Sequence, residues 1–350
     1  MSSTVAVVGA GAAGAAAAYA LRDAPVDVTV FEKSGGVCGR AATRRASGCT
    51  YEYGANYLKS DDDRVSELVT EELSTDGLVD VTEPVWTFDD DGEIAEGDGD
   101  AADHKWTYES GLTQLAKRLF AATDASVHRH TRVETLERDD ETWRVVDDEG
   151  DDRGTFDALV LTPPAPQTAD LLGQAAWEHG DCRDLRKSIA QVPFRTIISV
   201  VLHYPFELDV PYYALVNEGK SEGEGHDVGW VAREECKPGH VPDGESLLLV
   251  QMAPDWSAEY YHQPAPSIVD AASEKTAALL DDERLGTPDW TDHQHWRYAL
   301  PNGGPAVGAL DDATDHDLFF AGDWVAGDAR LHAAVRSGLE TGDAVAERLG

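Results

Sequence analysis

The chain opens with a pattern of apolar and small residues that predicts a strand, a turn and a helix. Residues 5–8 form a short β-branched and small apolar run, which is typical of a buried strand. Three glycines follow at the spacing G-x-G-x-x-G, and the alanine-rich stretch 15–22 favours a helix. After the break at Pro25, residues 26–31 alternate as a second strand that ends in Glu32.

The glycines of this unit stand where a dinucleotide site needs them. Gly9 allows a tight turn, Gly11 lets the backbone approach a pyrophosphate, and Gly14 lets the helix pack closely on the strand. The helix N-terminus offers free N–H groups to the phosphates. Glu32, about 20 residues further on, is the acid expected to accept hydrogen bonds from a ribose hydroxyl. We therefore predict a dinucleotide site, with a plain packing turn as the alternative.

The rest of the pattern divides into two groups of elements. Apolar spacing predicts helices at 64–74 and 111–122 and short alternating strands at 127–137, 143–147 and 156–161. At residues 86–88 the chain is expected to enter a second domain. One antiparallel sheet of that domain is predicted, with strands at 196–204, 212–216, 228–232 and 246–252. A helix at 267–281 is predicted to cover this sheet. Because 350 residues exceed what one compact core usually supports, two domains with a cleft between them are expected.

A glycine-rich loop, residues 34–43, follows the ribose-binding acid and carries Arg40. Such a loop can wrap the other side of a pyrophosphate, with the guanidinium of Arg40 as its charge partner. With this loop the sequence resembles the renalase branch of the amine-oxidase-like FAD oxidoreductases. Residues 39–45 are similar to that family's G-R-x-x-[ST]-x-R loop and residues 53–57 to its G-A-Q-Y segment. The segments 159–167, 296–299 and 321–324 resemble its return strand, its late aromatic motif and its closing flavin contact.

This resemblance implies an α/β fold in which a Rossmann-like FAD-binding domain, of the two-dinucleotide-binding-fold type, carries an inserted α+β substrate domain on an antiparallel sheet. The FAD-binding domain then takes residues 1–82, 104–164 and 300–350, and the substrate domain takes residues 83–103 and 165–299. The three short strands become a β-meander and the strand that returns to the cofactor.

The implied cofactor is non-covalent FAD, because no cysteine lies beside the segment 322–323. In the family, the residue at Val133 offers its backbone to the adenine; an ordinary strand valine is the alternative. Asp323 binds the ribityl hydroxyls or acts only as a helix N-cap, and the helix that starts near Leu331 aims its N–H groups at the flavin. The full predicted set is Gly9, Gly11, Ala13, Gly14, Glu32, Lys33, Arg40, Asn56, Tyr57, Val133, Asp323, Leu331, His332 and Ala333.

Several positions depart from the family pattern. Cys38 replaces a glycine, Asn56 a glutamine and His295 an arginine, while His332 and Ala333 replace an acid and a glycine. The FAD assignment survives these departures, which bear on the contacts to the flavin's pyrimidine ring.

The substrate side is predicted at the densest cluster of aromatic and basic residues. His295, Trp296 and Tyr298 lie in it, and the hypothesis places His295 and Tyr298 near the flavin face with Asn56 and Tyr57 opposite. The catalytic set is thus Tyr57, His295, Trp296 and Tyr298; packing of Trp296 and Tyr298 at the domain boundary is the alternative. No metal site is expected, because no acid or cysteine is spaced to complete one with the histidines.

The formal net charge of −38 opposes binding to nucleic acid and to anionic membranes and indicates adaptation to a cytoplasm of high salt. The acid clusters at 61–63, 89–91 and 147–152 are expected to be solvated surface. No run of 18 apolar residues occurs and no basic region precedes the first strand, so a cytoplasmic protein is expected. The four cysteines show no paired spacing and are expected to be free thiols. The oligomeric state stays open.

Three functions compete at this point. The resemblance implies oxidation of dihydronicotinamide isomers of NAD(P)H, with dioxygen as the electron acceptor and hydrogen peroxide as a product. Amine oxidation or isoprenoid desaturation on the same fold is the second possibility. A non-catalytic flavin-binding redox sensor, which belongs to a different class, is the third.

Overall fold

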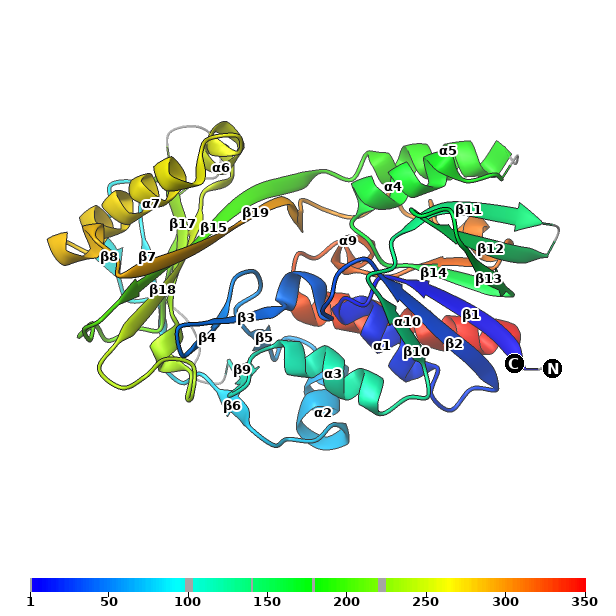
Figure 1. Ribbon diagram of the computed structural model, residues 1–350, viewed down its shortest axis with the longest axis horizontal. Coiled ribbons are helices and arrows are strands. Elements are labelled where there is room, and N and C mark those ends of the chain that lie inside the picture. Colours follow the sequence, from blue (N-terminus) through cyan, green and yellow to red (C-terminus); the bar gives the residue numbers. More distant parts are fainter. Residues whose placement is uncertain (1, 98–102, 140, 178–179, 220–224) are drawn as a thin grey trace.

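The computed structural model describes residues 2–97, 103–139, 141–177, 180–219 and 225–350 and shows two lobes (Figure 1). The long strands β15 (Phe194–Tyr204) and β19 (Trp290–Pro301) run between the lobes. Part of the predicted excursion into the second domain, residues 98–102, lies outside the described residues.

A sheet of five parallel strands forms the centre of the first lobe. Its order is β10 (Ser126–Arg129), β2 (Val26–Glu32), β1 (Ser3–Val8), β14 (Ala158–Leu161) and β20 (Leu318–Phe320). Because successive side chains of a strand point to opposite faces, Val5 and Val7 enter one core and Ala6 and Val8 another. The near-continuous apolar runs read from the sequence are those of a sheet buried on both faces.

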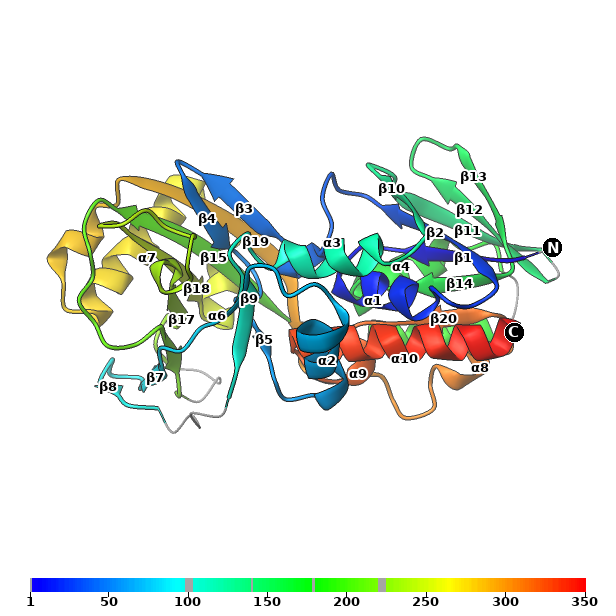
Figure 2. The ribbon, with the colours of Figure 1, turned by 90° about the horizontal axis from the view of Figure 1, so that it is seen from below.

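Two helices pack tightly on one face of this sheet. The helices α1 (Ala12–Ala20) and α10 (Leu331–Leu349) run side by side along the first lobe (Figure 2). A Cβ added at Gly338 would lie 2.2 Å from the carbonyl oxygen of Ala13, and one at Gly342 would lie 2.6 Å from that of Ala17. These two glycines, one helical turn apart, therefore let α10 approach the alanines of α1.

The other face carries an antiparallel meander of β11 (Val133–Asp139), β12 (Thr142–Asp147) and β13 (Asp152–Phe156). The predicted single strand 127–137 is wrong. It is two strands, because the chain turns near His130, whose φ is +57°, so that β10 joins the parallel sheet and β11 the meander. The predicted run 156–161 also divides, since Phe156 ends β13 and β14 begins at Ala158.

The helices α4 (Ala165–Gln174) and α5 (Gly180–Ala190) pack with this meander. Leu171, Leu172 and Leu185 share one apolar core with Trp143 of β12. Sequence analysis placed these helices in the substrate domain, whereas their packing places them in the first lobe. The amphipathic pattern of a helix shows which face is buried but not which neighbour covers it.

The second lobe is built on a seven-stranded sheet. Its order is β19, β15, β18 (Ser246–Met252), β17 (Val228–Arg233), β16 (Ala214–Asn217), β7 (Val85–Phe88) and β8 (Ile94–Ala95). The four strands predicted as one antiparallel sheet do pair antiparallel, and the sheet is extended by β7, which lies parallel to β16. On one face lie α6 (Pro254–Tyr260) and α7 (Ala265–Leu279), and on the other lies a hairpin of β3 (Thr43–Ala46) and β4 (Cys49–Glu52).

Smaller elements join the lobes. The strand β9 (Lys105–Tyr108) lies between β5 (Leu58–Lys59) and β6 (Leu78–Asp80). The predicted helix at 64–74 is α2 (Asp63–Glu67) continued by one turn of π-helix, Leu68–Glu72, and the one at 111–122 is α3 (Thr113–Ala121). The helices α8 (Asp311–Thr314) and α9 (Asp323–Ala326) flank β20. The predicted α/β class, with a Rossmann-like unit and a second lobe on its own sheet, is confirmed.

One acid cluster is not wholly solvated surface. Asp147 is 3% exposed, accepts hydrogen bonds from the backbone N–H groups of Glu149 and Asp151, and pairs with Arg153. It thus organises the turn between β12 and β13 rather than facing water. Among the described residues, no helix is both long and apolar enough to cross a membrane.

Candidate active site

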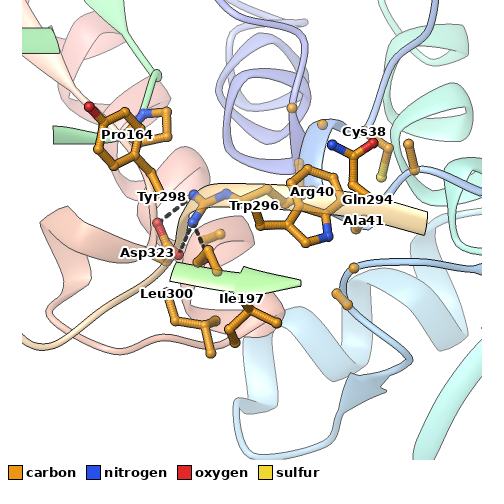
Figure 3. Close-up of a pocket in the computed structure, with 18 of the residues that line it drawn as sticks. Cys38, Arg40, Ala41, Pro164, Ile197, Gln294, Trp296, Tyr298, Leu300 and Asp323 are labelled. Atoms are coloured by element: carbon orange, nitrogen blue, oxygen red, sulfur yellow. Dashed lines mark hydrogen bonds and ion pairs between the residues drawn. The ribbon is translucent and has the colours of Figure 1, made fainter. Parts of the chain in front are cut away.

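A cavity of about 1910 Å³ extends between the two lobes. Its walls come from the glycine turn after β1, the glycine-rich loop after β2, the segment after β4, and the strands β15 and β19. Figure 3 shows Ile197 of β15 and Gln294, Trp296, Tyr298 and Leu300 of β19 close to Arg40 and Asp323. The cleft predicted between two domains is therefore present.

The glycine turn is shaped by close backbone packing on one side and by open space on the other. Gly9 has a φ of +103°, and a Cβ at Gly14 would lie 2.0 Å from the carbonyl oxygen of Gly9. A Cβ at Gly11, in contrast, would meet no atom within 4 Å, although Gly11 lines the cavity. The free space beside Gly11, at the N-terminus of α1, suits a pyrophosphate.

Glu32 lies at the end of β2 and forms hydrogen bonds to both the glycine turn after β1 and the glycine-rich loop after β2. One carboxylate oxygen accepts a hydrogen bond from the Ala10 backbone N–H (2.8 Å), and the other accepts from the backbone N–H and the hydroxyl of Ser34 (2.8 and 2.6 Å). Glu32 is 8% exposed and lines the cavity. Since each carboxylate oxygen has two lone pairs, these bonds leave acceptor capacity for a ribose hydroxyl.

Arg40 and Asp323 form a bidentate ion pair inside the cavity wall (Figure 3). Both N···O distances are 2.8 Å, and Nη1 of Arg40 also donates to the carbonyl oxygen of Ala299 at 2.8 Å. Asp323 begins α9 and accepts a hydrogen bond from the backbone N–H of Trp324. The two residues assigned to opposite parts of the cofactor thus contact each other, and Arg40 ties the glycine-rich loop to β19.

Several residues that line this cavity carry a buried polar side-chain atom with no hydrogen-bond partner among the described residues. These atoms are Asn56 Oδ1, Arg195 Nε, Trp230 Nε1, Trp256 Nε1, His295 Nε2 and His332 Nδ1. Buried polar atoms are nearly always hydrogen-bonded in folded proteins, so this concentration in one cavity indicates a polar ligand. Together with the space beside Gly11 and the acceptors on Glu32, these atoms fit a dinucleotide cofactor and a polar substrate.

The predicted substrate residues all line the cavity. Burial raises the pKa of the Tyr57 phenol, whose ring packs against Tyr213 and Trp230 with centroids 6.1 and 6.3 Å away. Burial, together with the charge of His293, lowers the pKa of His295, which favours the neutral form of its imidazole. A neutral imidazole offers one donor and one acceptor nitrogen.

Trp296 serves packing as well as the cavity wall. Its ring stacks on Tyr53 with centroids 5.4 Å apart and an interplanar angle of 16°, and its indole N–H donates to the Tyr53 carbonyl oxygen at 2.8 Å. Tyr298 packs edge-on against Phe194. Trp296 and Tyr298 therefore both pack at the boundary between the lobes and line the cavity.

The predicted cofactor residues separate into two groups. Ala13, Lys33, Val133, Leu331 and His332 line the cavity with the residues described above, and α10 begins at Leu331 as expected. Gly14 and Ala333 do not line it. Gly14 is packed against Gly9, as its predicted role requires, whereas Ala333 is fully buried and the cavity is lined by Ala334 instead.

Among the cavity residues that sequence reasoning missed are Arg195 on β15 and Arg330 just before α10. Neither forms an ion pair with a carboxylate within the described ranges, in a chain with 66 acidic residues. The pKa of Arg195 is lowered by burial and by the charge of Arg330, which places the two guanidinium groups near each other. Only the pairing of β15 with β19 brings Arg195 to the cavity, and no local sequence signal marks it.

Of the four cysteines, only Cys38 lines the cavity. It lies in the glycine-rich loop, its thiol donates to the carbonyl oxygen of Leu112 at 3.5 Å, and burial raises its pKa to about 12. A thiol with so high a pKa is a poor nucleophile. The expectation of four free thiols agrees with the structure.

Comparisons with known proteins agree with this architecture. Residues 7–71 match the model of an NAD(P)-binding Rossmann-like domain, and residues 85–346 match that of flavin containing amine oxidoreductases. A protein from Exiguobacterium sp. 255-15, named as a candidate protoporphyrinogen oxidase, superposes with a TM-score of 0.78 at 15% identity over 99% of each chain. Cyclohexylamine oxidase from Brevibacterium oxydans IH-35A gives 0.73 at 15% identity over 100% of each chain. Wild-type putrescine oxidase bound to putrescine gives 0.73 at 14% identity, over 99% of this chain and 98% of that one.

The solved structures share the fold, and the second family model covers well over half of the chain. The cofactor is FAD, as the glycine turn, Glu32 and the Arg40 loop predict. The chain therefore belongs to the family of flavin-containing amine oxidoreductases, with a Rossmann-like domain at its N-terminal end.

Proposed function

We propose that this oxidoreductase oxidises dihydronicotinamide isomers of NAD(P)H, in which the extra hydrogen sits on a ring carbon other than the usual one. When bound, FAD would supply the hydride acceptor for this reaction, and dioxygen would be the final electron acceptor, reduced with two protons to hydrogen peroxide. The dihydronicotinamide loses one hydride and leaves as NAD(P)⁺. The protein's own residues bind the donor, orient its ring and exclude water.

The observation that carries this proposal is a pair of arginines in the cavity wall, Arg195 and Arg330. Arg195 and Arg330 line it without a carboxylate partner among the described residues, so two positive charges are available to a ligand. Arginine binds phosphate well because its planar fork donates two parallel hydrogen bonds. A dinucleotide donor carries a pyrophosphate that satisfies these groups, whereas a cationic amine would be repelled by them.

The remaining polar atoms suit an uncharged ring with a carboxamide. The orphaned Oδ1 of Asn56 accepts from an amide N–H, and the neutral ring of His295 presents a second polar atom. Tyr57 and Trp230 supply flat apolar surface beside them. Such a wall fixes the donor ring in one orientation, and only a carbon held about 3–3.5 Å from the acceptor atom transfers its hydride efficiently.

The test is anaerobic reduction of the flavin in purified holoprotein, measured as the loss of the flavin's visible absorbance. Dihydronicotinamide isomers are expected to bleach the flavin rapidly, and ordinary NAD(P)H slowly. Bleaching by a primary amine but not by the isomers would establish amine oxidation instead. A protein that no member of a panel of isomers, amines and reduced isoprenoids or porphyrinogens reduces would be a redox sensor or binding protein.

A charge-specific variant separates the role of the arginines from general damage. Arg330→Gln is expected to raise the KM for the dinucleotide isomers while leaving the KM for an uncharged N-alkyl dihydronicotinamide isomer nearly unchanged. Arg336→Gln is the matched control, because Arg336 lies on the next turns of α10, pairs with Asp62 and does not line the cavity. Equal effects of Arg330→Gln on both donors would contradict anion recognition by this residue.

A further inference from the structure

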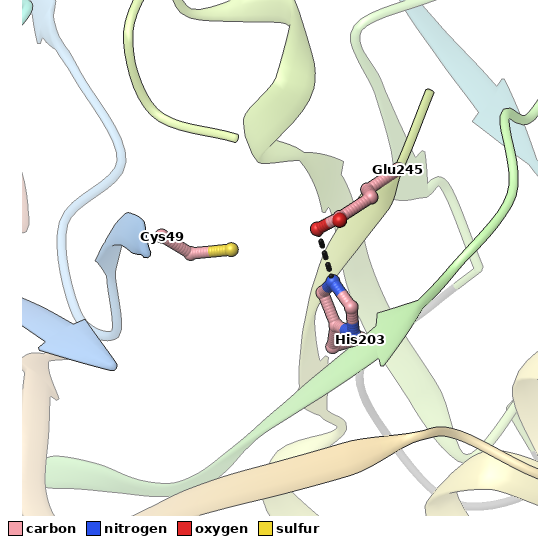
Figure 4. Close-up of side chains that lie close together, drawn as sticks. All are labelled: Cys49, His203 and Glu245. Carbon is pink, nitrogen blue, oxygen red and sulfur yellow. Dashed lines mark hydrogen bonds and ion pairs between the residues drawn. The ribbon is translucent and has the colours of Figure 1, made fainter. Parts of the chain in front are cut away.

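A second group of reactive side chains lies in the other lobe, away from the cavity. The ligand atoms of Cys49, His203 and Glu245 all lie within 4.8 Å of one another (Figure 4). They come from β4, from the end of β15 and from the turn before β18, and none of them lines the cavity. His203 is eight positions along β15 from Arg195, a distance of about 26 Å at the usual rise of a strand.

These three residue types are the ligand set of a borderline-soft divalent cation. A thiolate, an imidazole nitrogen and a carboxylate oxygen bind zinc at about 2.3, 2.0 and 2.1 Å, which puts tetrahedral ligand atoms roughly 3.5 Å apart. Nε2 of His203 already lies 2.8 Å from Oε2 of Glu245, so side-chain shifts of about 1 Å would complete the set. The side chain of Glu245 is 34% exposed, so water reaches a fourth position.

The surroundings of His203 supply a second and independent observation. Its Nδ1 is buried without a hydrogen-bond partner among the described residues and lies 3.6 Å from a carboxylate oxygen of Asp289. Its ring is stacked on Trp290, with centroids 5.1 Å apart and an interplanar angle of 13°. Metal-binding histidines commonly direct their second nitrogen at a carboxylate, which orients the ring and raises the basicity of the first. His203 has this arrangement, with Asp289 beside its Nδ1 and with Cys49 and Glu245 near its Nε2.

We propose that Cys49, His203 and Glu245 form a site for a zinc-type divalent cation, with water as the fourth ligand. The thiol gives up its proton to solvent on binding, so the thiolate and the carboxylate together neutralise the dication. Sequence spacing gave no sign of this site, because its ligands come from three distant segments.

A cation here would fasten the β3–β4 hairpin to the seven-stranded sheet. Cys49 shares an apolar core with Val201, Leu247 and Leu249 of that sheet. The chain after β4 continues directly to Asn56 and Tyr57 in the cavity wall. A cation at this site would therefore stabilise the packing behind one wall of the cavity.

The experiment uses cobalt(II) as a spectroscopic probe on holoprotein that has been treated with a chelator, in potassium chloride with a non-thiol reductant. Because the chain has 66 acidic residues, its surface is expected to bind divalent cations loosely. The total metal content therefore does not show whether the proposed site is occupied. A thiolate-to-cobalt charge-transfer band reports the cysteine itself. About one equivalent of cobalt is expected to produce this band, zinc to displace it, and a large excess of magnesium to leave it, because soft thiolates favour the transition metals.

Variants then assign the ligands. Cys49→Ser is expected to abolish the band, whereas Cys182→Ser, at a buried cysteine of α5, is the matched control and keeps it. Glu245→Gln, at a partly exposed position, is expected to weaken cobalt binding at least about tenfold. The flavin spectrum shows whether each variant folds. If Cys49→Ser does not fold, the effect of Glu245→Gln on cobalt binding tests the proposal.

Two results would overturn the proposal. Cobalt that binds without a thiolate band shows only adventitious binding to surface carboxylates. A band that persists in Cys49→Ser, or binding that Glu245→Gln leaves unchanged, places the cation elsewhere. Zinc should also raise the melting temperature of the wild type and of Cys182→Ser, but not that of Cys49→Ser.

Discussion

The ion pair between Arg40 and Asp323 offers the sharpest test of the cofactor site. Its partners are 283 positions apart in the sequence, and their side chains are 29% and 7% exposed. In Asp323→Asn, one of the two parallel charge-assisted hydrogen bonds is lost and the other becomes an ordinary one. Hydrogen bonds to charged groups contribute about 1.5–3 kcal/mol each, and partial hydration of Arg40 recovers some of this, so a net loss of about 2 kcal/mol is expected.

That loss should appear in cofactor affinity, because Asp323 is predicted to bind the ribityl chain and to orient Arg40 towards the pyrophosphate. A change of 2 kcal/mol corresponds to about a 30-fold weaker affinity for FAD. The assay is titration of the apoprotein with FAD, followed by quenching of flavin fluorescence in concentrated potassium chloride. Asp323→Glu, which keeps the charge, should recover part of the affinity.

A matched pair on α10 controls for the loss of any ion pair. Asp62 and Arg336 are 3.3 Å apart, and their side chains are 10% and 37% exposed, close to the values for Asp323 and Arg40. Asn at position 62 keeps the N-cap of α2, so Asp62→Asn removes only the charge. An FAD affinity of Asp323→Asn within twofold of the wild type, with a melting temperature lowered as in Asp62→Asn, would refute our reasoning. The pair would then only join the two lobes.

Four further predictions concern the cofactor, the substrate face, the buried charges and the surface. Glu32→Ala should weaken FAD binding by about 1–3 kcal/mol, measured in the same titration, because it removes charged hydrogen bonds. Replacement of Tyr57 by Leu or of His295 by Ala should slow anaerobic flavin reduction more than it weakens FAD binding. Burial raises the pKa of the Glu52 carboxyl to about 7, so between about pH 4.5 and 7 the folded state keeps a proton that the unfolded state has lost. The free energy of unfolding should therefore fall as the pH rises through this range. Glu52→Gln should make this fall smaller, measured as the melting temperature against pH. The melting temperature should rise steeply with potassium chloride, because at tens of millimolar salt the Debye length exceeds about 10 Å and the acids repel one another; a melting temperature independent of salt would contradict this.

Local pattern was enough to predict the βαβ unit, the glycine turn and the helices α2, α3, α7 and α10. In each of these, the signal and the structure lie within about 30 residues, as for β1, α1 and β2. The errors lie where the outcome depends on a distant partner. The run 127–137 alternates throughout, yet His130 divides it between two sheets, because β10 pairs with β2, far away in the chain, and β11 pairs with β12.

The same limit explains which site residues were missed. Glu32 and Arg40 belong to short motifs with fixed spacing, so the sequence alone indicated their chemistry. Arg195 lies in an apolar strand and acquires its position only when β15 pairs with β19. His203, near the other end of the same strand, meets Cys49 and Glu245 only after the hairpin and the sheet have packed together. Local motifs thus identified the cofactor type, whereas the positions of Arg195 and of the Cys49, His203 and Glu245 cluster depend on tertiary structure.

Charge links the surface of this protein to its cavity. A net charge of −38 creates a field that repels anionic substrates, and yet the cavity wall carries two arginines without carboxylate partners among the described residues. At about 0.15 M salt the Debye length is about 8 Å, so salt screens the repulsion from distant surface acids more strongly than a direct contact with Arg195 or Arg330. High salt therefore removes the long-range obstacle and preserves the short-range attraction. Under the proposed function, salt would therefore affect anionic and uncharged donors differently, so salt must be held constant whenever donors of different charge are compared.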